Sequence, residues 1–314
     1  MTVAVVTGCA GFIGSQIAEA CLARGDRVIG VDVFTDYYDI AQKRSNIEAL
    51  LRHPGFELHE HDISHGFEVF AAEADVVYHQ AGQPGVRASW REQFDEYMER
   101  NVAATQRLLE ACLHHGVGRV VYASSSSVYG NAERYPVDES MRPRPFSPYG
   151  VTKLAAEHLC SLYAANFGLS VVSLRYFTVY GPRQRPDMAA HRLFEAAIDG
   201  TDFPLFGSGE QLRDFTYVGD VVRANLCAGD ADVEPGLVAN IAGGGECSMI
   251  EHIALVEEIS GRPVPIDRRP GEHGDVRRTG GSVTVAHERL GWQPEVSLRD
   301  GLEHQHAWHL SRPR

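Results

Sequence analysis

The sequence has few lysines, no long apolar run and no cysteine motif, and each shortage excludes something. Lys43 and Lys153 are the two lysines among its 29 basic residues. Apolar runs stop far short of the roughly 20 residues that a membrane-spanning helix requires. The first residues form an apolar, strand-like segment without the basic and small-residue flanks of a signal peptide. We therefore expect a cytoplasmic protein with no membrane partner.

The polar composition excludes two further classes of protein. Six cysteines are scattered without CxxC spacing, so they fit small core residues in a reducing compartment rather than a zinc or disulfide framework. His114 and His115 precede Gly116, where capping of a helix end is a better interpretation than metal binding. We expect no metal site. The formal net charge of −13 argues against a nucleic-acid partner, because such a chain repels polyanions unless a few placed cations hold them.

Short apolar segments alternate with helix-length segments through residues 1–176. Strands are predicted at 2–7, 27–32, 56–60, 74–79, 119–124 and 170–175. Helices are predicted at 12–24, 40–52, 64–72, 89–115 and 149–166. This alternation is typical of α/β proteins with right-handed crossovers, and it predicts a Rossmann-like, doubly wound parallel sheet.

The pattern becomes less regular after residue 176. Proline, glycine and arginine are dense, and short helices near 188–199, 248–260 and 284–290 alternate with isolated strands. We predict a smaller mixed α/β domain formed mainly by 177–211 and 241–314, with 212–240 returning to the first domain. Ligands of open α/β sheets bind at the carboxyl ends of the strands, so the cleft should lie between the two parts.

A glycine-rich turn joins the first strand to the first helix. Gly8 would make the tight turn, Gly11 would let the backbone approach a pyrophosphate, and Gly14 would let the helix pack on the strand. Phe12 and Ile13 lie within the same turn. A glycine triplet alone is weak evidence, but here it has strand–turn–helix context. Residues 1–176 are therefore predicted to bind a dinucleotide.

Acidic residues after the next two strands indicate which dinucleotide is bound. Asp32 ends the second strand, where a carboxylate accepts hydrogen bonds from a ribose 2′-hydroxyl and repels a 2′-phosphate. We therefore predict NAD rather than NADP. Asp62 and Ile63 follow the third strand and could border the adenine, although Asp62 fits a helix N-cap equally well.

Tyr149 and Lys153 place a phenol and an ammonium four residues apart, on one face of a predicted helix. Oxidation of an alcohol by NAD⁺ needs a base for the hydroxyl proton. A free tyrosine has a pKa near ~10, and a neighbouring positive charge favours its phenolate. Lys153 would also bind the nicotinamide ribose, and a serine hydroxyl from the stretch 124–127 would hold the same substrate oxygen.

The spacing of the glycine turn, the serine stretch and Tyr-x-x-x-Lys resembles the extended short-chain dehydrogenases, and within them the NAD-dependent nucleotide-sugar epimerases, over essentially the whole chain. The resemblance implies that Ser125 is the catalytic serine, Tyr149 the base and Lys153 its modulator. It also implies a homodimer. Further cofactor contacts implied by position are Gln80, Ala81, Gly82, Tyr176 and Asn101, the last of which is alternatively structural.

The serine stretch bears on the reaction. Related sugar 4,6-dehydratases carry an Asp-Glu pair after the catalytic hydroxyl, and UDP-glucuronate decarboxylases usually carry a glutamate at the second position. This chain has Ser126 and Ser127 there. The remaining chemistry is a hydride shuttle that oxidises C4 of the sugar, turns the keto sugar and returns the hydride to the other face.

The segment from 175 to 188 resembles UDP-glucuronate 4-epimerases. Thr178 stands where UDP-glucose 4-epimerases typically have asparagine, and we expect Ser126, Ser127 and Thr178 to surround a C6 carboxylate. Arg185 and Arg192 are candidate cations for the carboxylate or a phosphate, with their roles undivided, and either is alternatively solvated. For the rest of the UDP-sugar, the resemblance implies Phe206 near the uracil, Arg213 at phosphate and Asp275 at ribose.

Four alternatives remain. Two lie within the same class: a UDP-glucose 4-epimerase, and a UDP-glucuronate decarboxylase that has lost its acid. A non-catalytic NAD-binding protein would be expected to lack Tyr149 or Lys153. A simple alcohol or ketone reductase would not need Arg213 and Asp275.

Overall fold

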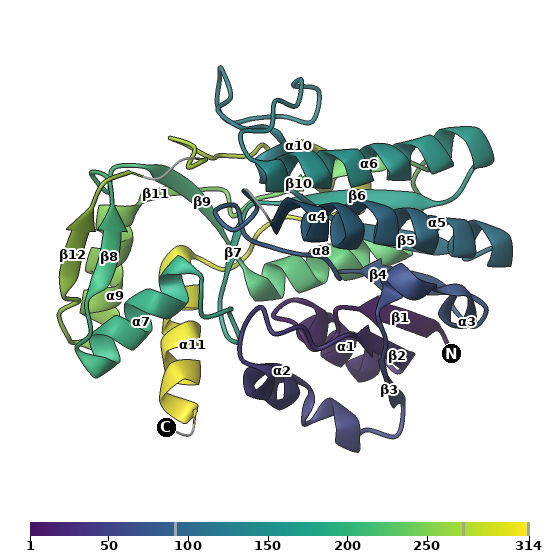
Figure 1. Cartoon of the computed structure of the whole chain (residues 1–314), viewed down its shortest axis with the longest axis horizontal. Helices are drawn as coiled ribbons and strands as arrows, with labels where there is room; N and C mark the ends of the chain where they lie inside the picture. The colour runs from purple at the N-terminus through teal and green to yellow at the C-terminus, as the bar shows by residue number, and fades with distance from the viewer. Residues whose placement is uncertain (91–92, 272–273, 313–314) are drawn as a thin grey trace.

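The computed structural model describes residues 1–90, 93–271 and 274–312, and its centre is a seven-stranded parallel sheet with helices on both faces (Figure 1). The strand order is β10-β6-β5-β4-β1-β2-β3. Its strands are β1 (Val3–Thr7), β2 (Arg27–Asp32), β3 (Phe56–Glu60), β4 (Val76–His79), β5 (Arg119–Ser125), β6 (Val171–Tyr176) and β10 (Leu237–Ile241). Every pairing in the sheet is parallel, which confirms the predicted doubly wound fold.

Alternating side chains of the strands fill two separate cores. Ala4 and Val6 join the core under α1 (Gly14–Ala23) and α8 (Val218–Asp230). Val5 points the other way, into the core under α5 (Ala104–His115) and α6 (Pro148–Phe167). Strands covered on both faces need apolar residues at every position, which is why these segments read as continuous apolar runs.

The remaining elements of the first part are short. They are α2 (Ile40–Ile47), the 3-10 turns η1 (Leu50–Arg52), η2 (Ile63–His65) and η5 (Ser126–Val128), and α3 (Glu68–Ala71). The helix predicted over 89–115 is divided into α4 (Phe94–Tyr97), a π-helical segment η4 (Met98–Ala103) and α5, while residues 91–92 lie outside the described chain. Such π segments are rare and often adjoin functional sites.

The second part carries two small sheets, at the left of Figure 1. In the first, β9 (Leu212–Tyr217) pairs with β7 (Thr178–Tyr180) and β11 (Glu246–Ser248). In the second, β8 (Phe203–Phe206) pairs with β12 (Ile266–Arg269). The helices that accompany them are α7 (Ala189–Asp199), α9 (Met249–Ser260), α10 (Thr284–Leu290) and α11 (Leu298–Ser311).

Pairing and packing divide the chain at slightly different places from the predicted boundaries. Segment 212–217 belongs to a small sheet, whereas α8 packs on α1 and β10 extends the large sheet. Residues of α10 also join the core beneath the large sheet, although 284–290 was predicted to lie with the second part. Helix α11 was not predicted, and it packs on α7 and α9.

Among the described residues, none of the helices combines the length and the apolar character that crossing a bilayer requires.

A buried histidine of the second part makes stability depend on pH. His252 on α9 is fully buried and lies edge-on to Phe215, with ring centroids 4.5 Å apart. Burial lowers its pKa to about 4 from the ordinary 6.5. Because the unfolded chain takes up this proton first, the folded state loses stability as the pH falls from about 6.5 towards about 4.

We expect His252→Leu to remove this acid sensitivity. Urea unfolding at pH 7 and pH 4.5 should show the variant losing about 2–3 kcal/mol less than the wild type over that interval. His158→Leu on the exposed face of α6 is the matched control and should follow the wild type. Parallel pH profiles for His252→Leu and the wild type would contradict the assignment.

Candidate active site

A cleft lies at the carboxyl ends of the large sheet's strands, where most residues predicted to contact the cofactor meet. The predicted residues that line it are Gly8, Gly11, Phe12, Ile13, Gly14, Asp32, Asp62, Ile63, Gln80, Ala81, Gly82, Tyr149, Lys153, Tyr176 and Arg185. Most of them come from the ends of β1, β2, β3 and β4, from the turns that follow these strands and from α6, while Tyr176 ends β6 and Arg185 follows β7. The topology of the sheet therefore brings them together.

The turn between β1 and α1 depends on glycine. Gly8 has a φ of 67°, and a Cβ there would lie 2.9 Å from the amide nitrogen of Ala81. A Cβ on Gly14 would collide with the carbonyl oxygen of Gly8. A Cβ on Gly11 would meet that same oxygen at 3.1 Å, and Gly11 lines the cleft. The turn therefore fits a phosphate cradle at the start of α1.

The two carboxylates predicted at the adenosine end follow β2 and β3. Asp32 Oδ2 accepts a hydrogen bond from Ala10 N at 3.0 Å, which ties the carboxylate to the glycine turn. Asp62 accepts a hydrogen bond from Ser64 N at 2.9 Å and caps η2. Both line the cleft with Ile63. Asp62 thus meets both interpretations given to it, as an N-cap and as a residue of the cleft.

A loop after β4 forms the floor near the reactive end. Ala81 N donates to Thr7 Oγ1 at 3.1 Å. Asn101, in the π-helical segment, accepts from Gln83 N at 2.6 Å and donates to Thr152 Oγ1 at 3.1 Å. Asn101 does not line the cleft as Gln80, Ala81 and Gly82 do, and it fastens their loop to α6. Its position fits the structural alternative rather than direct cofactor contact.

Helix α6 carries the predicted phenol and ammonium. Ser147 caps the helix by accepting from Gly150 N at 3.1 Å, and a proline opens it, so Tyr149 lies in the first turn. Lys153 is buried on the same face, and its Nζ donates to Ala123 O at 2.8 Å. Ser125, the last residue of β5, hydrogen-bonds Tyr149. The three predicted catalytic side chains therefore converge.

Burial dominates the acid–base character of this group. Burial raises the pKa of Tyr149, while the hydrogen bond with Ser125 and the charge of Arg185 act in the opposite direction. Burial also lowers the pKa of Lys153 to about 8. Arg185 is thus a cation that favours the phenolate here, which the sequence did not indicate.

Arg185 stands at the reactive end of the cleft. Its Nε and Nη2 donate to the two oxygens of Asp187 at 2.9 and 3.0 Å. The guanidinium lies 5.8 Å from the ring centroid of Tyr37, another residue of the cleft. A side chain held in this way presents its remaining nitrogen, Nη1, in a fixed place.

A second group of cations lies in the other part of the site, and we call it the arginine group: Arg87, Arg192, Arg213 and Arg269. Arg87 Nη2 pairs with Asp275 at 3.0 Å and stacks its guanidinium 4.1 Å from the ring centroid of Phe206. Burial lowers the pKa of Arg192, and the charges of Arg87 and Arg269 lower it further. Burial also lowers the pKa of Arg213, against the charge of Asp275.

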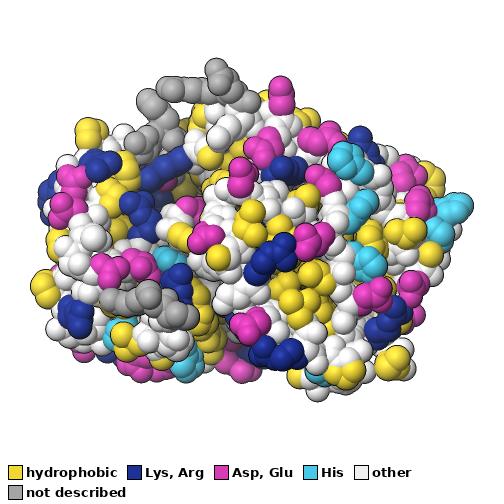
Figure 2. Space-filling view, turned by 60° about the horizontal axis from the view of Figure 1, so that its bottom comes forward, with side chains coloured by type: hydrophobic (Ala, Val, Ile, Leu, Met, Phe, Trp, Pro, Cys, Tyr) yellow, Lys and Arg dark blue, Asp and Glu magenta, His cyan; other side chains and the backbone are white. Residues whose placement is uncertain are grey.

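The arginine group contrasts with the acidic character of the whole chain. Figure 2 shows Lys and Arg side chains gathered around a hollow at the left of the view. Cations held close to one another lower each other's pKa and strongly favour an anion with several charges.

Of the three hydroxyl residues predicted near the sugar, Ser126 and Ser127 follow β5 directly, and Thr178 lies shortly after the end of β6. Ser126 and Ser127 form the turn η5, where Ser127 N donates to Ser125 Oγ at 3.1 Å. Thr178 is the first residue of β7 and pairs with Phe215. None of the three is among the residues that line the cleft described above.

Lys43 and Arg87 are among the cleft or pocket residues that were missed from the sequence. Lys43 on α2 lines the cofactor cleft, where its Nζ donates to the carbonyl and hydroxyl oxygens of Thr35 at 2.7 and 2.9 Å. The feature of the sequence that could have identified Lys43 is the rarity of lysine, because the chain has only two. Arg87 meets Asp275 across 188 residues of sequence, and no local pattern predicts such a pair.

Comparison with known proteins agrees with this geometry. The NAD dependent epimerase/dehydratase family profile matches residues 4–242. UDP-glucuronate 4-epimerase from Thermodesulfobacterium geofontis is 34% identical over 97% of this chain and 95% of its own. The structure of UDP-glucuronic acid 4-epimerase from Bacillus cereus with UDP-glucuronic acid and NAD is 40% identical over 98% of each chain, with a TM-score of 0.94. UDP-glucose 4-epimerase from Thermotoga maritima with UDP-glucose is 33% identical over 99% of each chain, with a TM-score of 0.88.

Proposed function

Because this chain belongs to the NAD dependent epimerase/dehydratase family, we propose that it inverts C4 of UDP-glucuronate to give UDP-galacturonate, with a bound NAD. The observation that carries the choice of sugar is Arg185, a cation beside Tyr149 at the reactive end of the cleft. Asp187 already pairs with two nitrogens of this guanidinium, and the C6 carboxylate of glucuronate would accept from the third, which a neutral sugar could do only as an uncharged acceptor.

The residues of the cofactor cleft fit NAD. A Cβ on Gly8 or Gly14 would strike neighbouring backbone, so these glycines allow the tight turn in which Gly11 lines the cleft and would let a pyrophosphate approach the start of α1. Asp32 at the end of β2 suits a ribose 2′-hydroxyl and disfavours a 2′-phosphate. When bound, NAD supplies the hydride acceptor and donor at C4 of the sugar.

Tyr149 would take the proton of the C4 hydroxyl, and Ser125 would hold the same oxygen. Burial raises the pKa of Tyr149, whereas the hydrogen bond with Ser125 and the charge of Arg185 lower it. Lys153, whose Nζ donates to the carbonyl oxygen of Ala123 at 2.8 Å, would bind the nicotinamide ribose and favour the phenolate of Tyr149. In the return step, Tyr149 gives its proton back to the C4 oxygen.

The residues next to Ser125 limit the chemistry to this shuttle. Removal of a C5 proton or expulsion of water requires an acid or base at the sugar, and Ser126 and Ser127 offer neutral hydroxyls instead. These hydroxyls and Thr178 would donate hydrogen bonds to the C6 carboxylate. We assign Nη1 of Arg185 to the same carboxylate, because Asp187 already takes its other nitrogens.

The arginine group would hold the diphosphate. Arg192 is placed there rather than at the carboxylate, because its charge interacts with Arg87 and Arg269. Arg213 completes the group, Asp275 would accept from ribose hydroxyls, and Phe206 would stack near the uracil. In this proposal, Arg185 would bind the carboxylate and Arg192 the diphosphate.

The experiment that tests the function follows UDP-glucuronate by NMR after incubation without added NAD⁺. We expect UDP-galacturonate to form, because NAD is regenerated in each turnover and stays bound. UDP-glucose in a parallel sample should react far more slowly. Faster turnover of UDP-glucose would favour the UDP-glucose 4-epimerase alternative, and accumulation of UDP-pentose would favour the decarboxylase.

Thr178→Ala should release pentose product. The keto sugar is a β-keto acid that loses CO₂ when the breaking bond aligns with the ketone π system, and Thr178 is expected to prevent that alignment. Loss of one hydrogen bond to a charged group should raise the ratio of pentose to epimer about tenfold. NMR integration of both products measures the ratio, with Thr178→Ser as the control. An unchanged ratio in Thr178→Ala would sink the idea.

The assembly and location that we propose are a cytoplasmic homodimer. Six free cysteines support a reducing compartment. Exposed apolar side chains on α6, namely Val151, Leu162 and Phe167, support a helix-to-helix contact between two copies. Light scattering distinguishes the dimer from a monomer.

A further inference from the structure

Two helices of the second part bring two histidines and a glutamate together away from the cofactor cleft. His191 and Glu195 lie four residues apart on α7, so they share one face of that helix. His309 reaches the same place from α11. One ligand atom from each of the three residues lies within 4.8 Å of the others.

The spacing of these atoms suits a metal ion. His309 Nδ1 lies 2.8 Å from Glu195 Oε1, and His191 Nε2 lies 3.7 Å from the same oxygen. Zinc bonds of about 2.0–2.1 Å in a tetrahedral site separate neighbouring ligand atoms by about 3.3 Å. The two observed separations lie on either side of that value, so small side-chain movements would complete the geometry.

His191 is oriented as metal-bound histidines are. Its Nδ1 lies 2.7 Å from the carbonyl oxygen of Gln184, which can only accept, so Nδ1 carries the proton and Nε2 presents a lone pair to the cluster. An imidazole whose Nδ1–H is fixed in this way needs no change of tautomer before Nε2 binds a metal.

The two histidines of the cluster are buried, whereas the glutamate is partly exposed. The side chains of His191 and His309 are 4% and 0% exposed, whereas that of Glu195 is 41% exposed. The histidines are therefore held rigidly by the packing of α7 on α11, and the carboxylate forms the entrance. Three protein ligands leave a fourth position for water.

We propose that His191, Glu195 and His309 form a binding site for a divalent transition metal of the zinc class. Two imidazoles and one carboxylate are donors that suit Zn²⁺, Co²⁺ and Ni²⁺. His309 binds through Nδ1 in its other neutral tautomer. Arg312, whose Nη1 lies 3.2 Å from Glu195 Oε1, competes with the metal for that oxygen and moves aside when the metal binds.

A bound metal would be coupled to the substrate side of the fold. His191 N donates to Gln184 Oε1 at 2.8 Å, and Gln305 of α11 donates to the same atom at 2.9 Å. Gln184 directly precedes Arg185. A metal that ties α7 to α11 would therefore stiffen the segment that carries Arg185, without contacting the substrate itself.

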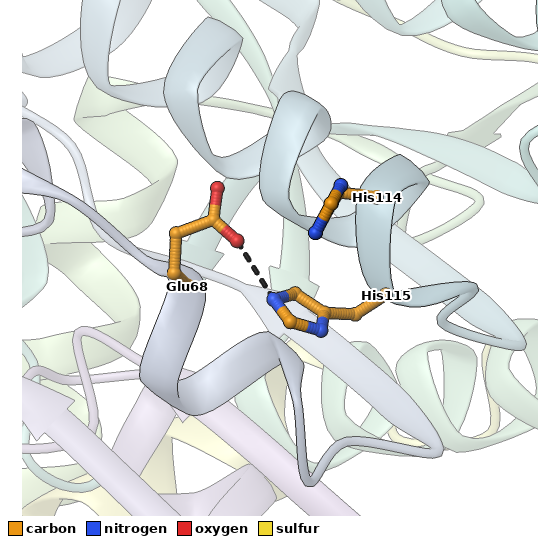
Figure 3. A group of neighbouring side chains, drawn as sticks. All are labelled: Glu68, His114 and His115. Atoms are coloured by element: carbon orange, nitrogen blue, oxygen red, sulfur yellow. Dashed lines mark hydrogen bonds and ion pairs between the residues drawn. The ribbon is translucent and has the colours of Figure 1, made fainter.

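A second cluster of the same residue types serves as an internal comparison. Glu68, His114 and His115 lie on the surface, where His115 Nε2 is 2.7 Å from Glu68 Oε2 (Figure 3). All three residues are exposed, and Figure 3 shows the His114 ring outside the hydrogen bond that joins the other two. Flexible exposed groups lose more entropy on binding, so we expect weaker metal binding there.

The experiment titrates chelator-treated full-length protein with Zn²⁺ by calorimetry and with Co²⁺ by visible absorption. We expect one tight site per chain and the intense Co²⁺ bands of a four-coordinate ion. Glu195→Gln removes a ligand at a half-exposed position that should fold normally, and it should weaken binding at least about tenfold. His114→Gln/His115→Gln should leave the tight site unchanged.

Thermal unfolding gives an independent measurement. Zn²⁺ should raise the Tm of the wild type and of His114→Gln/His115→Gln, but not that of Glu195→Gln. Arg312→Gln should bind Zn²⁺ at least as tightly as the wild type, because a competing cation has been removed. Equal affinity and equal Tm shifts in the wild type and Glu195→Gln would overturn the proposal, as would the absence of a tight site in the wild type.

Discussion

Tyr149→Phe is expected to lower kcat for C4 inversion by about 10²- to 10⁴-fold, because a positioned general base contributes about that much. The phenol is the group that would receive the C4 proton, and its hydrogen bond with Ser125 fixes its direction. Removal of one oxygen from a half-buried ring in the first turn of α6 leaves the packing of that helix in place. The loss should therefore appear in turnover rather than in folding.

The measurement is an NMR time course under saturating UDP-glucuronate, together with the NAD content of the purified variant. Tyr163→Phe on the same helix is the control, because its hydroxyl meets Gln106 and Glu110 on the far side from the cleft. The control should keep its activity. If Tyr149→Phe retained full turnover with NAD bound, another group would have to be the base.

Arg175→Met is expected to destabilise the protein by about 3–5 kcal/mol, because it leaves a buried carboxylate without its cation. Arg175 Nη2 lies 2.6 Å from Glu157 Oε1, and the two side chains are 5% and 3% exposed. Glu157 also accepts from Ser124 Oγ at 2.6 Å, and Arg175 donates to Tyr129 at 2.7 Å. The pair thus fastens α6 to the ends of β5 and β6, next to Ser125, the proposed catalytic serine.

Urea unfolding at pH 7 measures this loss. Arg52→Met is the matched control, since Arg52 pairs with Glu48 at 2.9 Å where both side chains are about 70% exposed, and such a surface pair is worth less than about 1 kcal/mol. Arg175→Met/Glu157→Leu should recover much of the stability, because no buried charge is left unpaired. A loss for Arg175→Met as small as that of Arg52→Met would refute the account.

Local patterns were enough to predict the large sheet. All six predicted strands of the first part are present, with boundaries within two residues of the predicted ones. Strands buried on both faces must be apolar at every position, and the glycine turn can be read from three residues. The π-helical segment and α11 were not predicted. The spacing of apolar residues does not distinguish the first from an ordinary α-helix or the second from a loop.

Some residues of the predicted site could also be placed from local patterns, and others could not. Gly8, Asp32, Tyr149 and Lys153 could be placed from sequence because each follows a strand or lies on a helix at a fixed spacing. Arg185 and Arg192 are seven residues apart and could not be told apart. The structure separates them, since one pairs with Asp187 beside the phenol and the other lies among the arginine group.

The sequence by itself determined the sheet, the dinucleotide turn and the phenol–ammonium pair, because each is encoded by residues close together in the chain. Tertiary structure alone decided that Arg185 lies beside Tyr149, that Arg87 meets Asp275, and that α7 and α11 bring His191, Glu195 and His309 together. The physical reason is that these contacts join residues up to 188 positions apart, and their energies depend on burial and distance, which no local pattern contains.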